Sequence, residues 1–176
     1  GHASSSVGQP STANVNCREP SFFNLAGEAS QQSVYDDLLT IPADTTTPVD
    51  ATLIPTGEFR PVEGTPFDFR TPHKIGERIN AKDEQITFGG GYDHNWVLSK
   101  PADAFAFAAR VSEPTSGRVM EVWTDEPGMQ FYCGNFLDGT DIGKGGRPYP
   151  FRSALCLEAQ HFPDSPNHPD YPSVVL

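Results

Sequence analysis

The sequence predicts an all-β fold in which two sheets pack face to face, and three observations lead to this prediction. Among its 176 residues are 16 glycines and 17 prolines, which recur every several residues with short apolar runs between them. No stretch repeats apolar residues at i, i+3, i+4 and i+7 over three turns, as an amphipathic helix would. Aromatic residues are plentiful, with 12 Phe, 5 Tyr and 2 Trp, so a bulky core is available although only 36% of the residues are hydrophobic.

The length suits a single domain of ordinary size. Residues 1–13 are rich in serine and show no hydrophobic period, which predicts a flexible tail. Order is expected to begin near Asn14, so that residues 14–176 form one domain.

Five strands are indicated, all in the second half of the chain. The first is Tyr92–Leu98. A hairpin follows, in which Ala104–Val111 and Arg118–Thr124 are joined by a loop that contains proline and glycine. The last two strands are expected at Met129–Cys133 and Arg152–Ala159.

The first arm of the hairpin carries the packing prediction. Side chains alternate along a strand with period two, so Phe105, Phe107, Ala109 and Val111 are expected on one face. Alanines occupy positions 104, 106 and 108 on the other face, where small side chains would allow a second layer to approach closely. This pattern favours a sheet packed on a sheet.

The charge balance limits the partners. Twelve basic residues against 23 acidic ones give a net charge of −11, and no cluster of Lys or Arg is present. Nucleic acid and anionic membranes both require concentrated positive charge, so neither is expected as a partner, and a neutral or cationic ligand is favoured. The longest apolar run, residues 104–109, is far shorter than the ~20 residues that cross a bilayer.

The cysteines are Cys17, Cys133 and Cys156, an odd number without Cys-x-x-Cys spacing. They imply neither a disulfide framework nor a zinc site, and a reducing cytoplasm is the expected location. The histidines and aspartate of residues 161–168 are interrupted by prolines and fit no standard metal signature. No metal is expected.

Glu158 is a candidate general base. In the strand Arg152–Ala159, Leu155 and Leu157 share one face and Glu158 lies on the other. A carboxylate among small residues on a sheet could line a pocket and move a proton. The alternative is a solvated Glu at the end of a strand, or an ion pair with Arg152.

Asp93 follows a run of three glycines and stands among Tyr92, His94, Asn95 and Trp96. Carboxylates, amides and aromatic rings together are typical of sugar sites, because polar groups bind hydroxyls and rings pack on C–H faces. In the alternative, Asp93 forms an Asx-turn and Trp96 belongs to the core.

Gln130 is expected to share a face with Tyr132, while Met129, Phe131 and Cys133 point to the opposite side. Its amide could donate to a ligand hydroxyl, although a lone Gln on a strand surface is the alternative.

Seven short blocks stand in a fixed order along the chain. They are residues 22–27 (FFNLAG), 47–50 with 54–57 (TPVD, IPTG), 64–70 (GTPFDFR), 90–95 (GGYDHN), 126–130 (EPGMQ), 134–137 (GNFL) and 157–164 (LEAQHFPD). In content and order they resemble the C-terminal half of the aldose 1-epimerase (galactose mutarotase) family. The resemblance implies a galactose-mutarotase-like β-sandwich, truncated at both ends.

The resemblance also implies an activity, the interconversion of the anomers of a hexose such as galactose or glucose. Glu158 matches the family's base, and Asp93 and Gln130 match residues that hold sugar hydroxyls. No cofactor is implied, because only protons move.

Two departures from the family weaken this implication. Family members carry Asn-His-Ser-Tyr-Phe-Asn-Leu where residues 19–25 read Glu-Pro-Ser-Phe-Phe-Asn-Leu, so Pro20 stands at the position of the acid histidine and Phe22 replaces a tyrosine. Family members are also about twice as long, and their N-terminal half supplies an Arg and a second His to the site.

The sequence therefore leaves three interpretations open. The first is an impaired epimerase, the second a non-catalytic carbohydrate-binding or regulatory module, and the third a domain that needs the missing half as a second chain. Half of a large sandwich leaves an apolar face or a sheet edge uncovered, so a homo-oligomer or a strand exchange is expected.

Overall fold

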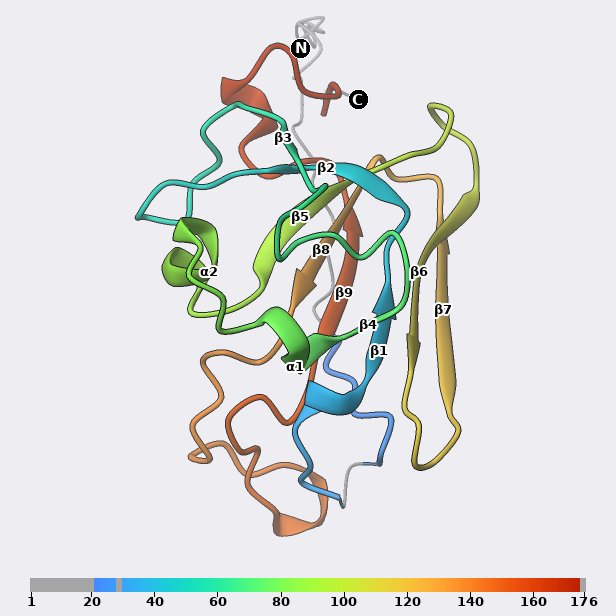
Figure 1. Ribbon diagram of the computed structural model, residues 1–176, viewed down its shortest axis with the longest axis vertical. Helices are drawn as coiled ribbons and strands as arrows, with labels where there is room; N and C mark the ends of the chain where they lie inside the picture. The colour runs from blue at the N-terminus through green and yellow to red at the C-terminus, as the bar shows by residue number, and fades with distance from the viewer. Residues whose placement is uncertain (1–20, 28–29, 175–176) are drawn as a thin grey trace, which may run out of the picture.

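The computed structural model describes residues 21–27 and 30–174, which form two antiparallel sheets packed face to face (Figure 1). One sheet has four strands in the order β4-β1-β6-β7, and the other has five in the order β3-β2-β5-β8-β9. The predicted all-β sandwich is confirmed. The expected tail, residues 1–13, and Asn14 lie outside the described residues.

The strands are short and several irregular connections separate them. In chain order the elements are η1 (Val34–Asp36), β1 (Leu38–Thr40), β2 (Ala43–Thr47), β3 (Arg60–Pro61), β4 (His73–Lys74), α1 (Ile75–Arg78), α2 (Glu84–Gly89), β5 (Asp93–Leu98), β6 (Ala106–Ser112), β7 (Val119–Thr124), β8 (Gly128–Tyr132), η2 (Lys144–Gly146), β9 (Cys156–Gln160) and η3 (Ser165–Asn167).

All five predicted strands are present, and the largest shift is at the start of β9. It begins at Cys156 rather than at Arg152. Arg152 has a φ of 55°, in the left-handed region, and therefore belongs to the turn before the strand.

The prediction that Phe105, Phe107, Ala109 and Val111 share one face of the first hairpin arm is wrong. The register between β6 and β7 shifts between Phe107 and Ala109, so Ala108 is an extra residue in a β-bulge. The bulge breaks the alternation. Ala109 and Val111 are buried in the core, whereas Phe105 is 72% exposed on the outer side of the sheet.

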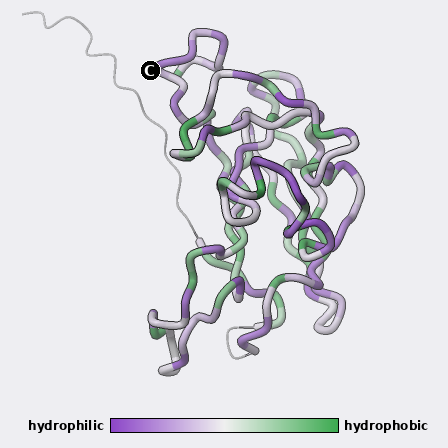
Figure 2. Tube along the Cα trace, turned by 60° about the vertical axis from the view of Figure 1, so that its left-hand side comes forward, coloured by the Kyte–Doolittle hydropathy of each residue, from purple (hydrophilic) through white to green (hydrophobic). Residues whose placement is uncertain are grey.

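The core between the sheets is aromatic. Its largest rings, at contact distances from one another, are Phe67, Phe69, Tyr92, Trp96 and Phe131. The indole N–H of Trp96 donates to the carbonyl oxygen of Phe67 at 3.0 Å, so its polar end is satisfied inside the core. Hydrophobic stretches lie along the strands in the middle of the molecule (Figure 2).

Helices play a minor part. Within residues 21–27 and 30–174, no helix has the length and apolar content needed to cross a bilayer. The most useful one for the site is α2, which ends just before β5. Its first turn is capped by the Asp83 side chain, which accepts a hydrogen bond from the Gln85 N–H, and Gly90 ends it in the left-handed conformation.

Candidate functional site

The five-stranded sheet has one apolar and one polar face. Alternation along β8 sends Met129 and Phe131 into the core and leaves Gln130 and Tyr132 on the polar face, as predicted. The side chains of β9 alternate in the same way, and Leu157 lies in the core.

One row of polar side chains crosses four strands of this face. The cross-strand partners are Thr47 with Asn95, Asn95 with Gln130, and Gln130 with Glu158. Directly opposed residues in an antiparallel pair have Cβ atoms about 4.5–5.5 Å apart, so neighbouring members of the row are within reach of one small ligand. Two of the three predicted site residues, Gln130 and Glu158, are therefore immediate neighbours.

Asp93, the third predicted residue, joins the row by a hydrogen bond. The Gln130 Nε2 donates to Asp93 Oδ1 at 2.8 Å, diagonally across β5 and β8. Asp93 lies within the strand rather than in an Asx-turn. Gln130 is 8% exposed and is not a solvated strand-surface amide.

Glu158 is also buried, at 8% exposure, so the alternative of a solvated strand-end carboxylate is wrong. The ion pair with Arg152 is not formed either. The Arg152 guanidinium instead donates to Asn135 Oδ1, the Tyr35 hydroxyl and the Gly90 carbonyl.

Cys156 lies on the polar face close to both carboxylates. Burial, followed by the negative charges of Glu158 and Asp93, raises the pKa of its thiol to about 12. The thiol therefore stays protonated and uncharged at neutral pH. Cys133 and Cys156 are both free and buried.

A pocket of about 210 Å³ opens on this face. Its polar lining includes Asp93, Asn95 and Gln130. Apolar residues of the loop after β2 and Pro163 close its other side. The combination of a few fixed polar groups with apolar walls is typical of sites for small polar molecules.

The loop before β5 holds Asp93 in place. Asn135 Nδ2 donates to the carbonyl oxygens of Gly89 and Tyr92, at 3.0 and 2.9 Å. Arg152 Nη2 donates to the Gly90 carbonyl at 2.6 Å. These hydrogen bonds fix the conformation of the turn that the glycine run forms, which ends two residues before Asp93.

The aromatic rings expected beside the sugar are not on this face. Tyr92 and Trp96 are both fully buried in the core, which confirms the core alternative for Trp96. Tyr132 is the aromatic residue next to Asp93 in the register, and the edge of the Phe22 ring packs on it at 6.2 Å. Phe23 forms an antiparallel bridge with Leu155, just before β9. Pro20 lies outside the described residues.

His94 faces the core beside Asp93. Its Nδ1 accepts a hydrogen bond from the Asp93 N–H at 3.1 Å. Burial lowers the pKa of His94 to about 4, so the imidazole is neutral at physiological pH.

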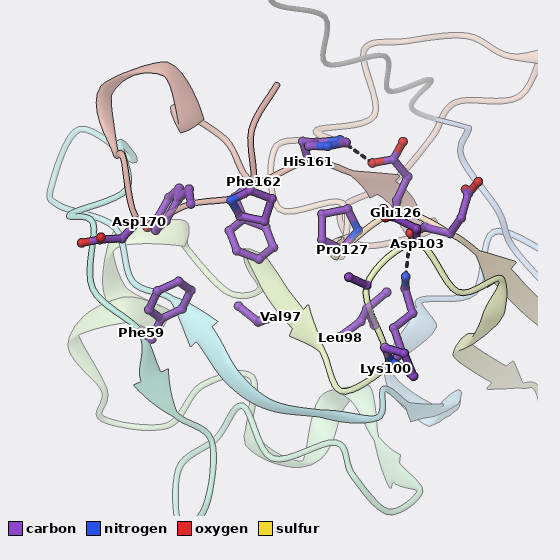
Figure 3. Close-up of a pocket in the computed structure, with 15 residues that line it drawn as sticks. Phe59, Val97, Leu98, Lys100, Asp103, Glu126, Pro127, His161, Phe162 and Asp170 are labelled. Carbon is purple, nitrogen blue, oxygen red and sulfur yellow. Dashed lines mark hydrogen bonds and ion pairs between the residues drawn. The ribbon is translucent and has the colours of Figure 1, made fainter. Parts of the chain in front are cut away.

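A larger pocket of about 600 Å³ lies at one end of the same sheet (Figure 3). Phe162 and Pro127 stand on its wall, and His161 and Glu126 form an ion pair of 2.7 Å at its rim. In the described part of the chain, no three His, Cys, Asp or Glu side chains gather closely enough to hold a metal ion. His168 pairs separately, with Asp164 at 3.3 Å.

Sequence reasoning named Asn95 as the amide beside Asp93 but missed Thr47 and Gln160 as members of the polar network. Asn95 Nδ2 donates to Thr47 Oγ1 at 3.3 Å, and Gln160 Nε2 donates to Asn95 Oδ1 at 3.3 Å. The period-two pattern places Asn95 on the face of Asp93 and Gln160 on the face of Glu158, so alternation was the signal that could have found Gln160.

The fold is a two-sheet antiparallel sandwich of the aldose epimerase type, as a solved structure shows. The GalM/aldose epimerase homologue from C. elegans superposes with a TM-score of 0.75 at 28% sequence identity, over 90% of this chain and 46% of that one.

The chain belongs to the aldose 1-epimerase family, whose sequence model matches residues 20–176. It is 51% identical to the galactose mutarotase of Homo sapiens over 92% of this chain and 45% of that protein. It is 40% identical to the aldose 1-epimerase of Escherichia coli (strain K12), over 90% of this chain and 44% of the relative. The chain thus spans somewhat less than half the length of these curated relatives, and the resemblance seen in the sequence is confirmed.

Proposed function

We propose that this chain carries part of an aldose 1-epimerase site for a hexose such as galactose or glucose, with Glu158 as the base and Asp93 and Gln130 as hydroxyl-binding groups. The observation that supports it most is the central place of Gln130. Its amide is hydrogen-bonded to Asp93, and its strand partner is Glu158. The pocket on this face is lined by Asp93 and Gln130 but not by Glu158, so a ligand that contacts all three has to extend from the pocket across Gln130 toward β9.

The chemistry of the reaction is a movement of protons. Glu158 accepts the proton of the anomeric hydroxyl while an acid protonates the ring oxygen, and the ring opens. Rotation about the C1–C2 bond and reclosure then give the other anomer. Asp93 accepts hydrogen bonds from hydroxyls, and Gln130 can both donate and accept them. The proposed reaction uses no cofactor.

The proposed activity is impaired. Pro20 stands where the family resemblance expects the acid histidine, and proline has no proton to donate. A positioned acid typically contributes ~10²–10⁴-fold to such a step, so protonation by water instead would leave a slow enzyme.

The same proline favours the second candidate, a carbohydrate-binding or regulatory module without catalysis. Such a module needs Asp93 and Gln130 but no acid. The two candidates share a site and differ in turnover.

Polarimetry of freshly dissolved α-glucose tests the activity. We expect the wild-type protein to accelerate the decay weakly, Glu158→Gln to abolish the acceleration, and Pro20→His to increase it. Glu121→Gln is the matched control, because Glu121 lies half-exposed on the other sheet and pairs with Arg110 at 3.6 Å. Fast decay in the wild type would contradict the impaired site, and equal decay with Glu158→Gln would remove Glu158 as the base.

Saturation-transfer NMR tests the sugar site that the two candidates share, and together with polarimetry it separates them. Both predict millimolar binding of glucose or galactose that weakens in Asp93→Ala, since an unmade hydrogen bond to a buried partner costs on the order of 1–3 kcal/mol. Binding without any polarimetric activity would identify the module. Equal signals from the wild type and Asp93→Ala would exclude Asp93 from the site.

A further inference from the structure

Two amide side chains meet across β8, the strand that carries Gln130. Asn95 comes from β5 on one side and Gln160 from β9 on the other, and Gln160 Nε2 donates to Asn95 Oδ1 at 3.3 Å. The same Nε2 donates to Gln130 Oε1, also at 3.3 Å. Gln160 is 1% exposed, so this contact lies beneath the surface of the polar face.

Gly128 makes the crossing possible. It is the strand partner of both Val97 and Gln160, which places it under the point where the two amides meet. A Cβ at Gly128 would collide with Asn95 Oδ1 and would lie 2.9 Å from the Phe162 ring. Any residue other than glycine would therefore fill the space that the amide pair uses. Phe162 also lines the larger pocket (Figure 3).

Asp93 determines which group donates and which accepts in each hydrogen bond of this network. An ionised carboxylate only accepts, so the Gln130 amide must turn its Nε2 toward Asp93. Its Oε1 is then left to accept, and Gln160 Nε2 is the donor that reaches it. The bonds therefore run from Gln160 to Gln130 to Asp93.

The two polar atoms of the Gln160 amide differ in how they are satisfied. Its Oε1 is buried and has no hydrogen-bond partner among the described residues. A buried acceptor without a donor destabilises the folded state. The Nε2 group of the same side chain, by contrast, is the donor to two buried acceptors, Asn95 Oδ1 and Gln130 Oε1. What the glutamine offers that leucine does not is the Nε2 donor.

We propose that Gln160 is a positioning residue for the sugar site. By donating to Gln130 Oε1 it fixes the orientation of the Gln130 amide, so that one Nε2 hydrogen stays on Asp93 and the second is held for a ligand hydroxyl. Asn95 and Gly128 support this role, the first by sharing the donor and the second by leaving the space. The assignment of a ligand rests on the proposed function, whereas the orientation of the Gln130 amide does not.

The test compares three variants by NMR of the side-chain amides. Gln160→Leu removes the donor and keeps the bulk, and Gly128→Ala keeps Gln160 but blocks the crossing. Gln31→Leu is the control, because Gln31 is an exposed glutamine whose Nε2 donates to the Pro148 carbonyl, away from this network. We expect the Gln130 Nε2 hydrogens to exchange with water at least fivefold faster in Gln160→Leu and Gly128→Ala, and at the wild-type rate in Gln31→Leu.

Exchange of the Gln130 amide in the folded variant, rather than thermal stability, distinguishes positioning from a purely structural role. Gln160→Leu leaves the buried Gln130 Oε1 and Asn95 Oδ1 without this donor, so we expect a lower melting temperature. In the folded variant the affinity for glucose or galactose should fall about fivefold, the effect of one weakened hydrogen bond. Unchanged Gln130 exchange in a folded Gln160→Leu protein would overturn the proposal. If the wild type binds no sugar but the exchange responds as expected, the proposed function fails and the positioning of Gln130 stands.

Discussion

Asp37 is a buried carboxylate at the start of the four-stranded sheet, only 4% exposed. Burial, followed by the negative charges of Glu113 and Asp36, raises its pKa from 3.8 to about 7. Glu113 keeps its charge because hydrogen bonds from the side chain and the N–H of Ser116, and then from the N–H of Thr115, lower its pKa to about 2. The folded protein thus favours a protonated Asp37 beside an ionised Glu113.

The prediction concerns stability against pH. An unfolded Asp releases its proton near pH 3.8 and the folded Asp37 near pH 7, so its stabilising contribution is complete below about pH 4 and is lost as the pH rises through 7. We expect Asp37→Asn to be as stable as the wild type at pH 4 and more stable at pH 8, by on the order of 2 kcal/mol.

Urea unfolding at pH 4, 6 and 8 measures this difference. The exposed Asp125 provides the control, as Asp125→Asn should leave the pH dependence unchanged. The low pKa of His94 acts on the wild type and the variant alike and cancels in the comparison. A constant difference between the proteins at all three pH values would contradict the prediction.

The sheet face on which a residue lies was predictable wherever side chains alternate regularly along the strand. Alternation placed Gln130 and Glu158 on the face opposite the leucines and phenylalanines without knowledge of their neighbours. Their contacts were not predictable, because the pairing of Gln130 with Glu158 depends on the register of β8 against β9. Gln160 escaped notice for the same reason, since its partners lie one and two strands away.

Among the elements, the turn between α2 and β5 determines where Asp93 points. Gly91 has a φ of 138°, which residues with a side chain rarely adopt. A Cβ at this position would collide with Asn135 Oδ1 and would lie 2.9 Å from Arg152 Nη2. Both the backbone and the surrounding hydrogen bonds therefore require glycine.

We expect Gly91→Ala to lower the free energy of unfolding by on the order of 3 kcal/mol, from backbone strain together with the disturbed Asn135 and Arg152 contacts. Sugar binding should weaken as well, because Asp93 lies two residues away. The measurement is chemical denaturation combined with the NMR binding assay. Gly64→Ala is the matched control: Gly64 also has a positive φ, of 73°, but no atom within 4 Å of an added Cβ. Equal losses in both variants would mean that the contacts at Gly91 contribute nothing.

Sequence patterns also failed to predict four short strands, one bulge and the burial of two aromatic residues. β1, β3 and β4 are only two or three residues long, too short to show a period, and were not predicted. β2 has five residues, but three of them are consecutive threonines, which show no alternation of apolar and polar side chains. The bulge at Ala108 follows no glycine or proline, and it separates Phe105 and Phe107 from the face of Ala109 and Val111 that they were expected to share. Tyr92 and Trp96 stand next to polar residues in the sequence, yet the sheet sends both to the core.

For the whole molecule, the outer side of the four-stranded sheet carries an aromatic stripe, defined by Phe105, Phe107 and Trp123. The rings of Phe105 and Trp123 stack at 6.5 Å, and Phe107 meets Trp123 edge-on at 5.8 Å. Trp123 lies on β7, an edge strand, whereas Phe107 lies at the start of the neighbouring β6 and Phe105 just before it (Figure 1). An exposed apolar surface beside an unpaired edge favours association.

We therefore expect the protein to self-associate through this stripe, by pairing or exchange of β7 between two copies. Light scattering over a range of concentrations should show a dimer that the double variant F105S/W123S converts to a monomer. Ile142→Ser is the control, since Ile142 is equally exposed but lies on the loop between β8 and β9. A wild-type monomer at every concentration would contradict this expectation.

The two tryptophans occupy opposite environments, and each belongs to a different sheet. Trp96 of the five-stranded sheet is fully shielded, whereas Trp123 of the four-stranded sheet is 52% exposed. Their fluorescence should differ accordingly, with blue-shifted emission from the first and acrylamide-quenchable, red-shifted emission from the second. Each half of the sandwich thus has its own optical reporter, and replacing either indole by phenylalanine would reveal whether the two sheets melt as one cooperative unit.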